Sequence, residues 1–229
     1  TVVIYLPLDG AWLNRTVKLH AGIEGNIDLP ITWEIFHPYP ESAWVNVGLQ
    51  PSVQDTIDWN TIYTEDGRNL LLRAWAEDNE GMRGEDTITI HIDNTAPITS
   101  LSIGEPQYIA PDSAHIYVSS ATLFTLSAYD SLVGVDKIYY AIDDTAQAVV
   151  YSAPFTINKT DGIHYIYYYS VDALGNREEQ KSQKIYLDNT PPVTTVSFGE
   201  PHYGEEPTYI TSQTLISLTV TDGEGSGVS

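Results

Sequence analysis

The sequence Asp93-Asn94-Thr95-Ala96-Pro97 recurs almost unchanged as Asp188-Asn189-Thr190-Pro191-Pro192, 95 residues later. The pair Asp66-Gly67 returns as Asp161-Gly162 at the same spacing. Self-similarity at a fixed period is typical of an array of like structural units. The chain is therefore predicted to consist of tandem repeats, and the Asp-Asn-Thr-Pro stretches are predicted to join them.

The period divides the chain into residues 1–94, residues 95–189 and residues 190–229. The first two segments are long enough to form small domains, whereas the third matches only the beginning of a repeat. Two strands cannot close a sandwich. We therefore expect the third segment to be the N-terminal part of a third repeat, cut short.

Alternating polar and apolar residues with many β-branched and aromatic side chains dominate both complete repeats, and turn residues interrupt them at short intervals. About seven short strands in such a length are typical of an immunoglobulin-like sandwich. The predicted fold class is all-β, with tandem immunoglobulin-like β-sandwiches and a truncated third unit. The predicted strands are Val2–Leu8, Val17–Ile23, Ile31–Phe36, Trp44–Leu49, Thr56–Trp59, Asn69–Glu77 and Thr87–Ile92, then Thr99–Ile103, Leu123–Tyr129, Val135–Ile142, Gln147–Val150, Phe155–Ile157, His164–Val171 and Lys181–Leu187.

Two aromatic residues sharpen this prediction. Trp33 lies on the third predicted strand, where such sandwiches bury a large aromatic side chain. Tyr165 follows the Asp161-Gly162 turn at the start of the sixth strand of the second repeat, which is the place of a tyrosine corner. We expect both rings to be packed in their sandwiches.

Several motifs carry a family resemblance. The second repeat contains Pro154-Phe155-Thr156-Ile157 and Tyr169-Ser170-Val171-Asp172-Ala173-Leu174-Gly175-Asn176, and the third begins its second strand with Leu218-Thr219-Val220-Thr221-Asp222-Gly223. These stretches are similar to the Ig-like repeats of prokaryotic surface proteins known as OmpL47-type domains. The first repeat, with Ala74-Trp75-Ala76-Glu77-Asp78, resembles bacterial and archaeal Ig-like domains. The resemblance implies a fold and a cell-surface setting rather than an activity.

The charge balance excludes some partners. Aspartate and glutamate total 31 against 10 lysines and arginines, so the net charge is −21. Such a chain repels nucleic acids and anionic membranes and attracts cations. We expect no nucleic-acid partner and no membrane insertion within these residues, because no apolar run approaches the roughly 18 residues that a spanning helix needs. We expect any targeting or anchoring segment to lie outside them.

No catalytic constellation is evident. The chain has no cysteine, and its six histidines are dispersed without a His-x-x-x-His pair. It also lacks a Gly-x-Ser-x-Gly elbow and a phosphate-binding loop. We therefore predict that the chain is not an enzyme and that it has no catalytic residues.

The acidic residues around the predicted joints suggest calcium, which prefers six to eight oxygen ligands from carboxylates, amides, carbonyls and water. The Ig-like resemblance implies that each linker meets the turn before the sixth strand of one repeat and the loops after the second and sixth strands of the next. That arrangement would gather Asp66, Asp93, Asn94, Asp130 and Asp172 at the first joint and Asp161, Asp188, Asn189 and Asp222 at the second.

The same residues also have a structural reading, which the turn chemistry favours. Aspartate before glycine commonly bonds nearby backbone N–H groups in a turn. The Asp-Asn pairs of the linkers could simply end a strand before proline, which cannot continue a ladder. No metal is required in that case, and Ca²⁺ is the one cofactor that the sequence suggests.

Two further features concern partners. Aromatic residues in the stretches 138–140 and 165–169 alternate onto both faces of their strands, so some of them must point outward, where they could stack on sugars or on neighbouring strands. Asn14 and Asn158 each begin an Asn-x-Thr sequon and are candidate glycosylation sites.

The predicted function is therefore a non-catalytic extracellular array of structural or adhesive units, forming part of a cell-surface stalk, filament or surface-layer protein. Its expected partners are further copies of the repeat or of the protein, and surface glycans. The alternative is an accessory spacer or carbohydrate-binding region of a larger secreted enzyme.

Overall fold

The computed structural model describes residues 1–25, 27–37, 42–111, 115–223 and 225–227. Strands make up its regular structure, and the only helical segments among these residues are the short 3-10 turns η1 (Thr61–Tyr63) and η2 (Thr145–Gln147). No helix in this described part of the chain has the length and apolar character needed to cross a membrane. The all-β fold class is confirmed.

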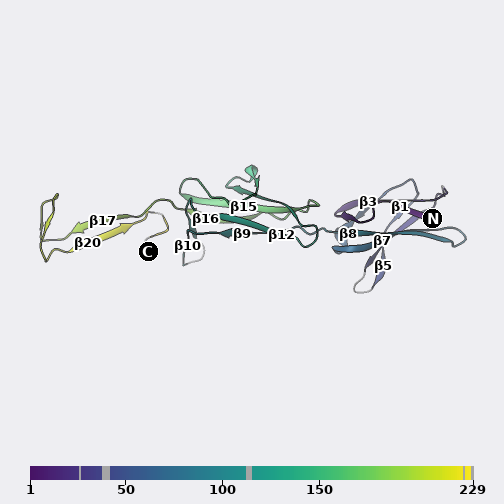
Figure 1. Cartoon of the computed structure of the whole chain (residues 1–229), viewed down its shortest axis with the longest axis horizontal. Coiled ribbons are helices and arrows are strands. Elements are labelled where there is room, and N and C mark those ends of the chain that lie inside the picture. Colours follow the sequence, from purple (N-terminus) through teal and green to yellow (C-terminus); the bar gives the residue numbers. More distant parts are fainter. Residues whose placement is uncertain (26, 38–41, 112–114, 224, 228–229) are drawn as a thin grey trace. The chain divides into compact units, whose positions relative to one another are not determined.

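The first repeat forms two facing sheets (Figure 1). One has the order β1-β3-β6 and the other β2-β8-β7-β4-β5. All pairings are antiparallel except that of β2 with β8, which is parallel. The strands are β1 (Val2–Leu6), β2 (Ala11–Leu13), β3 (Thr16–Ile23), β4 (Ile31–His37), β5 (Ala43–Gln50), β6 (Ile57–Asn60), β7 (Gly67–Glu77) and β8 (Arg83–Ile92).

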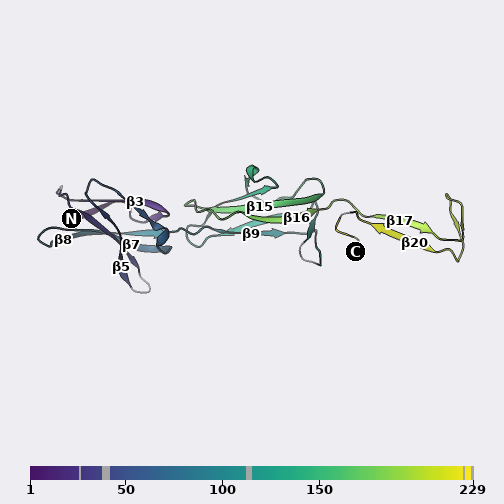
Figure 2. The ribbon, with the colours of Figure 1, turned by 180° about the vertical axis from the view of Figure 1, so that it is seen from behind.

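The second repeat follows the same plan, with a six-stranded sheet of order β10-β11-β16-β15-β13-β14 and a pair β12-β9. Figures 1 and 2 both show β9 on one side of this repeat and β15 with β16 on the other. The strands are β9 (Ile98–Ile103), β10 (Gln107–Ile109), β11 (Ile116–Val118), β12 (Phe124–Tyr129), β13 (Val135–Ile142), β14 (Val149–Val150), β15 (Gly162–Asp172) and β16 (Lys181–Leu187). The predicted strand Phe155–Ile157 is reduced to a single bridge between Phe124 and Phe155.

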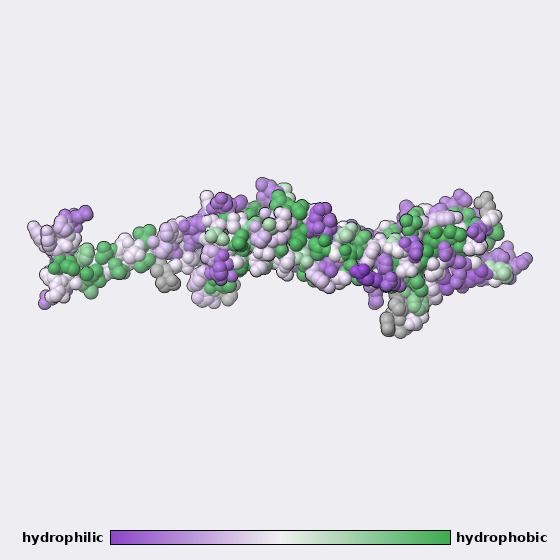
Figure 3. Space-filling model, in the orientation of Figure 1, coloured by the Kyte–Doolittle hydropathy of each residue, from purple (hydrophilic) through white to green (hydrophobic). Residues whose placement is uncertain are grey.

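The third repeat consists of two strand pairs: β17 (Val193–Phe198) with β20 (Ile216–Thr221), and β18 (His202–Tyr203) with β19 (Tyr209–Ile210). The pair β17–β20 carries apolar side chains at the surface, which appear green in Figure 3. Leu218 is 70% exposed, whereas its counterpart in the second repeat, Leu126, is 4% exposed. Among the described residues of the third repeat, the apolar side chains of this pair therefore stay at the surface.

The strand order identifies the first two repeats as immunoglobulin-like sandwiches. In the first repeat, β1 pairs with β3, and the short strand β2 lies parallel to β8 in the other sheet. In the second repeat, β9 pairs with β12, and the short strand β11 lies parallel to β16 in the other sheet. The chain divides into two compact units. One consists of Thr1–Ile98 with Ala128–Lys137 and Ser170–Glu178, and the other of Thr99–Ser127 with Ile138–Tyr169 and Glu179–Ser229. The repeat boundaries predicted at residues 94/95 and 189/190 stay predictions.

The crossing between sheets was not foreseen. A single strand was predicted over residues 2–8, but β1 ends at Leu6 and β2 begins at Ala11 in the other sheet. Pro7 cannot donate to a ladder, and Gly10, at φ 77°, takes a left-handed conformation that favours glycine. A three-residue strand such as β2 is too short to produce a recognisable alternation in sequence.

The core of the first repeat is built around Trp33, as predicted. Its side chain is fully buried, together with Ile31 and Ile35 on the same strand and Leu72 and Ile90 from the neighbouring strands. Alternate residues of β4 therefore face inward, which is the period of a half-buried strand. Burial of such side chains contributes roughly 1.5–3 kcal/mol each.

The prediction for Tyr165 was wrong. His164 and Ile166 face inward on β15, so Tyr165 points to the opposite face, and its side chain is 40% exposed. Its ring stacks on Tyr167 with the centroids 6.2 Å apart. The Asp-Gly turn was correctly located, but a shift of one residue along a strand moves a side chain to the other face.

His164 instead occupies the inward position, and Asp143 fixes it there. Its Nδ1 lies 2.9 Å from an Asp143 oxygen, and its Nε2 lies 2.9 Å from the Thr160 carbonyl oxygen. Burial favours a higher pKa for Asp143, but hydrogen bonds from Lys159, the Tyr165 N–H group and His164 outweigh it and lower that pKa to about 2. These hydrogen bonds join Asp143, which lies between β13 and η2, to the start of β15.

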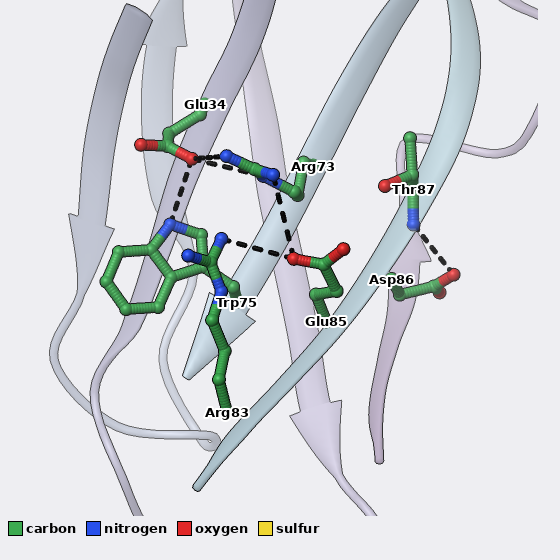
Figure 4. Close-up of polar contacts among 7 residues, drawn as sticks. All are labelled: Glu34, Arg73, Trp75, Arg83, Glu85, Asp86 and Thr87. Atoms are coloured by element: carbon green, nitrogen blue, oxygen red, sulfur yellow. Dashed lines mark hydrogen bonds and ion pairs between the residues drawn. The ribbon is translucent and has the colours of Figure 1, made fainter. Parts of the chain in front are cut away.

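The outer face of the larger sheet in the first repeat carries a ladder of charged and aromatic side chains (Figure 4). Arg73 donates to a Glu34 oxygen from Nε at 3.1 Å and from Nη2 at 2.5 Å, and Trp75 Nε1 donates to the same oxygen at 3.0 Å. The Arg73 guanidinium also lies 3.9 Å from the ring centroid of Trp44, and that of Arg83 lies 4.1 Å from Trp75. These contacts join β4, β5, β7 and β8 by their outer side chains.

Replacing Arg73 tests how much this ladder contributes. Arg73→Ala removes both Arg73 hydrogen bonds and the opposite charge from the Glu34 carboxylate, 18% exposed, and leaves it with the neutral Trp75 donor, so the free energy of unfolding should fall by roughly 2 kcal/mol. Urea denaturation of the full chain measures this change. Lys18→Ala is the matched control, because the Lys18–Asp58 pair is 62% and 59% exposed and should contribute less than about 0.5 kcal/mol. Equal losses in the two variants would contradict the assignment.

Candidate metal centre at the linker between repeats

The first linker (residues 93–97) is bound by the aspartate that precedes β7. Asp66 Oδ1 accepts hydrogen bonds from the Asn94 N–H group at 2.8 Å and from Asn94 Nδ2 at 3.2 Å. Its other oxygen accepts one from the Thr95 hydroxyl at 2.5 Å. We call this three-residue arrangement the linker clasp. Beyond the end of β8, the Asp66 carboxylate therefore accepts the Asn94 N–H group in place of a carbonyl oxygen from a neighbouring strand.

The Asn94 side chain is bound to the first repeat on both of its polar atoms. Its Oδ1 accepts from the Arg15 N–H group at 2.8 Å and from the Thr61 hydroxyl at 3.1 Å. Its Nδ2 donates to the Thr61 carbonyl oxygen at 3.1 Å. Asn94 therefore fastens the linker to the loops of its own sandwich.

The second linker (residues 188–192) repeats the clasp. Asp161 Oδ1 accepts from the Asn189 N–H group at 3.0 Å and from Asn189 Nδ2 at 2.8 Å, and its Oδ2 accepts from the Thr190 hydroxyl at 2.6 Å. The hydrogen bonds from Thr190 and Asn189 lower the pKa of Asp161. In both copies the aspartate and asparagine are 28 residues apart. The sequence repeat is thus also a repeat of specific bonds.

Three carboxylates converge beside the first clasp. Asp93 follows β8, Asp130 follows β12, and Asp172 ends β15, and all three belong to the first compact unit. One oxygen from each lies within 4.8 Å of the others. Asp93 and Asp172 are 0% and 1% exposed, and Asp130 is partly exposed. We call these residues the acidic triad.

Backbone N–H groups of the loop after β12 orient two of these side chains. Asp130 Oδ1 accepts from the Leu132 and Gly134 N–H groups at 3.0 and 2.8 Å. Asp93 Oδ2 accepts from the Val133 N–H group at 3.3 Å. The loop after β12 therefore binds the carboxylate of Asp93 from the linker and the carboxylate of Asp130, its own first residue.

Asn176 holds the third carboxylate in place. Its Nδ2 donates to Asp172 Oδ2 at 2.7 Å and to the Asp93 carbonyl oxygen at 2.8 Å. Asn14 Nδ2 in turn donates to Asn176 Oδ1 at 3.1 Å and to the Leu174 carbonyl oxygen at 3.0 Å. These bonds tie the linker backbone to the loop after β15.

The acidic triad places two buried carboxylates, those of Asp93 and Asp172, beside the partly exposed Asp130. Burial raises the pKa of Asp93, and the negative charges of Asp130 and Asp66 raise it further, whereas the Thr95 and Val133 N–H groups oppose the shift. Ionised Asp93 is therefore less stable in the folded chain than in the unfolded one. A cation between the carboxylates would offset the free-energy cost of ionising Asp93.

The second linker reproduces part of the same arrangement within the second compact unit. Asp188 Oδ2 accepts from the Ser226 N–H group at 2.7 Å, and Asp222 Oδ2 accepts from the Gly227 N–H group at 2.7 Å. Asp222 Oδ1 is buried and has no hydrogen-bond partner among the described atoms. Among the described residues, Asp188 and Asp222 are the carboxylates of this linker that correspond to Asp93 and Asp130.

The predicted site residues thus fall into two groups. The structure brings together Asp93, Asp130 and Asp172, while the oxygens of Asp66 and Asn94 are occupied by clasp and loop hydrogen bonds. Their role in binding Ca²⁺ stays a prediction. Asn176 was missed as a site residue, although it completes the Asp-x-x-Gly-Asn pattern that begins at Asp172.

The two candidate glycosylation sites differ in their surroundings. Asn14 uses its Nδ2, the atom to which a glycan would be attached, in the two hydrogen bonds that hold the loop after β15. Asn158 is exposed in the segment between β14 and β15. Of the two, only the side chain of Asn158 is accessible without breaking these bonds.

No known family model matches this sequence, and no curated protein matches it. Among solved structures, the fibronectin(III)-like modules of Clostridium thermocellum CbhA are 14% identical, with 82% of this chain and 94% of theirs covered and a TM-score of 0.37. A 1.5-MDa bacterial ice-binding adhesin is 13% identical, with 87% and 68% covered and a TM-score of 0.42. A Ca²⁺-stabilized adhesin of an Antarctic bacterium is 12% identical, with 81% and 47% covered and a TM-score of 0.33. Similarity at this level does not identify a ligand or partner for this chain.

Removing one charge from the acidic triad should stabilise the metal-free protein. In Asp130→Asn the amide oxygen keeps both N–H bonds, and the repulsion of Asp93 is lost, so the free energy of unfolding in EDTA at pH 7 should rise by roughly 1 kcal/mol. Because the folded pKa of Asp93 is raised, its ionisation costs stability above that pKa, and the gain should shrink as the pH is lowered toward about 4. Urea titrations at several pH values measure this. Asp136→Asn, at an exposed residue paired with Lys137, should change little; destabilisation by Asp130→Asn would refute the repulsion.

The linker clasp predicts a local change in mobility. Asp161→Ala removes three acceptor contacts from Asn189 and Thr190, so the amide order parameters of residues 189 and 190 should fall from about 0.85 toward 0.6 or below. ¹⁵N relaxation of the full chain measures this. Asp144→Ala is the control, because the Asp144 side chain accepts hydrogen bonds from the nearby Ala146 and Gln147 of its own turn, away from the linker in the sequence. Unchanged linker order in Asp161→Ala would show that the clasp does not hold the linker.

Proposed function

We propose that this chain is a section of a non-catalytic, extracellular array of Ig-like units, part of a stalk, filament or surface-layer protein, in which the linkers transmit force instead of acting as free hinges. The observation that carries this proposal is the linker clasp, which recurs with the same donors and acceptors at Asp66 and at Asp161. A free hinge would leave the linker amides to water, whereas here side chains bind them. Proline after each clasp further restricts the backbone.

Calcium binding at the acidic triad is part of the proposal. Ca²⁺ lies about 2.3–2.6 Å from its oxygen ligands, so two ligands on opposite sides of the ion are roughly 5 Å apart. The triad oxygens, within 4.8 Å of one another, fit this spacing. Backbone carbonyl groups or water molecules would supply the remaining ligands.

Electrostatics supports a divalent cation at this place. Two of the three carboxylates are buried, and the pKa of Asp93 is raised by burial and by its acidic neighbours. A bound cation stabilises all three ionised groups together and favours the fold over the unfolded chain, which cannot assemble the site. Because the carboxylates come from the linker and from two loops of the following repeat, the cation would tie these segments together.

A second role, binding of surface glycans, is favoured by the outward tyrosines of the second repeat, of which Tyr165 is 40% exposed. This role fits an adhesive unit of the array. It also fits the alternative of an accessory region in a larger secreted enzyme.

Calcium titration tests the metal site. At a free Ca²⁺ concentration 100 times its dissociation constant, the free energy of unfolding should rise by about 2.7 kcal/mol relative to EDTA. Isothermal titration calorimetry and thermal unfolding of the full chain provide the two measurements. Asp130→Asn should abolish both the binding heat and the stabilisation, although it stabilises the metal-free protein.

Asp136→Asn serves again as the control, because it removes an equal charge from an exposed position in the same compact unit. It should leave the calcium response intact. A wild-type chain with no binding heat and the same unfolding temperature in Ca²⁺ and EDTA would eliminate the calcium site. In that case the clasp would remain as the basis of the linker proposal, with its own relaxation test.

A further inference from the structure

The outer face of the six-stranded sheet in the second repeat is unusually rich in tyrosine. Ile166 on β15 and Ile185 on β16 are fully buried, so the residues that alternate with them point outward. These outward residues include Tyr165, Tyr167 and Tyr186. The face therefore presents aromatic rings where a solvent-exposed sheet usually carries charged side chains.

The row continues across neighbouring strands. Tyr186 on β16 lies opposite Tyr117 on β11, with ring centroids 5.2 Å apart, and Tyr117 lies opposite Tyr108 on β10, with centroids 6.2 Å apart. Tyr165 and Tyr167 add a nearly parallel pair on β15, with an angle of 19° between their ring planes. We call Tyr108, Tyr117, Tyr165, Tyr167 and Tyr186 the tyrosine face. It extends over four strands as two groups of rings, with Ile163 opposite Tyr186 and Lys184 opposite Tyr165 between them.

A cleft opens at one end of this face. It has a volume of about 390 Å³, and its walls include the rings of His115, Tyr117 and Tyr186 together with the side chains of Asp161 and Thr190. His115 contacts Tyr186 with centroids 4.8 Å apart. The cleft thus combines aromatic surfaces with carboxylate and hydroxyl groups, the mixture of apolar walls and few polar groups that small-molecule sites show.

From these features we infer that the tyrosine face and its cleft bind a neutral polysaccharide chain. A pyranose ring has C–H bonds on its flat faces, and their positively polarised hydrogens favour the electron-rich face of an aromatic ring. Its hydroxyl groups can donate to Asp161 and exchange hydrogen bonds with the tyrosine hydroxyls. The cleft accommodates a terminal or bent sugar unit, and the row of rings accommodates the units that follow it.

The negative charge of the chain favours a neutral polymer over an anionic one. The chain carries a net charge of −21, and Asp161 and Asp188 border the cleft. Lys184 is the one cation that contacts the tyrosine face in the described contacts; it donates to the Tyr186 hydroxyl at 2.6 Å and lies 4.6 Å from that ring centroid. Uronate-rich or sulfated polymers would meet repulsion from the surrounding field.

The same charge disfavours a second copy of this chain as the occupant, because two copies would each bring a net charge of −21 to the contact. The inference deepens the proposed glycan-binding role and rests on it, and its cleft shares Asp161 and Thr190 with the second clasp. It does not depend on the calcium proposal or on the linkers transmitting force. Loss of polysaccharide binding would leave both of those unaffected.

Affinity electrophoresis of the full chain, followed by calorimetry with the best binder, tests the inference. The probes are soluble mixed-linkage β-glucan, xyloglucan, galactomannan and pullulan, with polygalacturonate as the charged counterpart. At least one neutral polymer should bind, and polygalacturonate should not. Tyr186→Ala and Tyr165→Ala should each weaken binding roughly tenfold, whereas Tyr186→Phe, which keeps the ring, should bind within about threefold of the wild type.

Tyr63→Ala is the matched control, because Tyr63 is 86% exposed in the first repeat, away from the tyrosine face in the chain. It should bind as the wild type does, and circular dichroism should show that all variants fold. The inference is overturned if no neutral polymer binds, if polygalacturonate binds best, or if Tyr63→Ala loses as much affinity as Tyr186→Ala and Tyr165→Ala. Concentration-dependent dimerisation that Tyr186→Ala abolishes, without polysaccharide binding, would assign the face to self-association instead.

Discussion

The hydrogen bonds from each linker to the aspartate of the preceding turn are the interaction on which the rest of this structure depends. A strand that ends before proline leaves its next N–H groups without a ladder partner. Asp66 and Asp161 each accept the backbone N–H group of the linker asparagine and the hydroxyl of the threonine that follows it. The last strand of each sandwich can therefore continue into the linker with its polar groups satisfied, and the position of the acidic triad beside the first linker follows from this.

The clasp also explains why negative charge accumulates at the same place. Asp93 is fully buried because the linker that carries it is bound from both sides, by Asn94 contacts to the first repeat and by Asn176 from the loop after β15. A buried carboxylate costs free energy unless it is paired or neutralised. Its N–H partners supply part of the compensation, and a divalent cation would supply more. Structural bonding and calcium affinity are therefore not competing explanations, because the first creates the setting for the second.

The tyrosine face shows how the same fold can carry binding chemistry away from its linkers. The first repeat uses its corresponding outer surface for the ladder of Glu34, Arg73 and Trp75, in which charged groups satisfy one another. The second repeat places tyrosines there instead, and their rings contact one another without a comparable set of ion pairs in the described contacts. The charged groups of the first surface bond to one another, whereas the second surface presents tyrosine rings, with Lys184 bonded to the Tyr186 hydroxyl. The common fold does not require this difference.

The strand content and the burial of Trp33 could be anticipated, since alternation and a fixed repeat depend on local sequence. The convergence of Asp93, Asp130 and Asp172 was implied by the resemblance to Ig-like domains. The three-residue strands β2 and β11 could not, because pairing with β8 and β16 forms them, and their own sequences are too short to show a pattern. Tyr165 was assigned to the wrong face for a related reason, as the register of a strand is set by its partners. The sequence by itself determined the all-β class, the period and the residues that recur at each linker. Only the tertiary structure decided which of these residues bind the linker, which face one another as carboxylates and which rings lie outside, because those choices depend on contacts between segments distant in the chain.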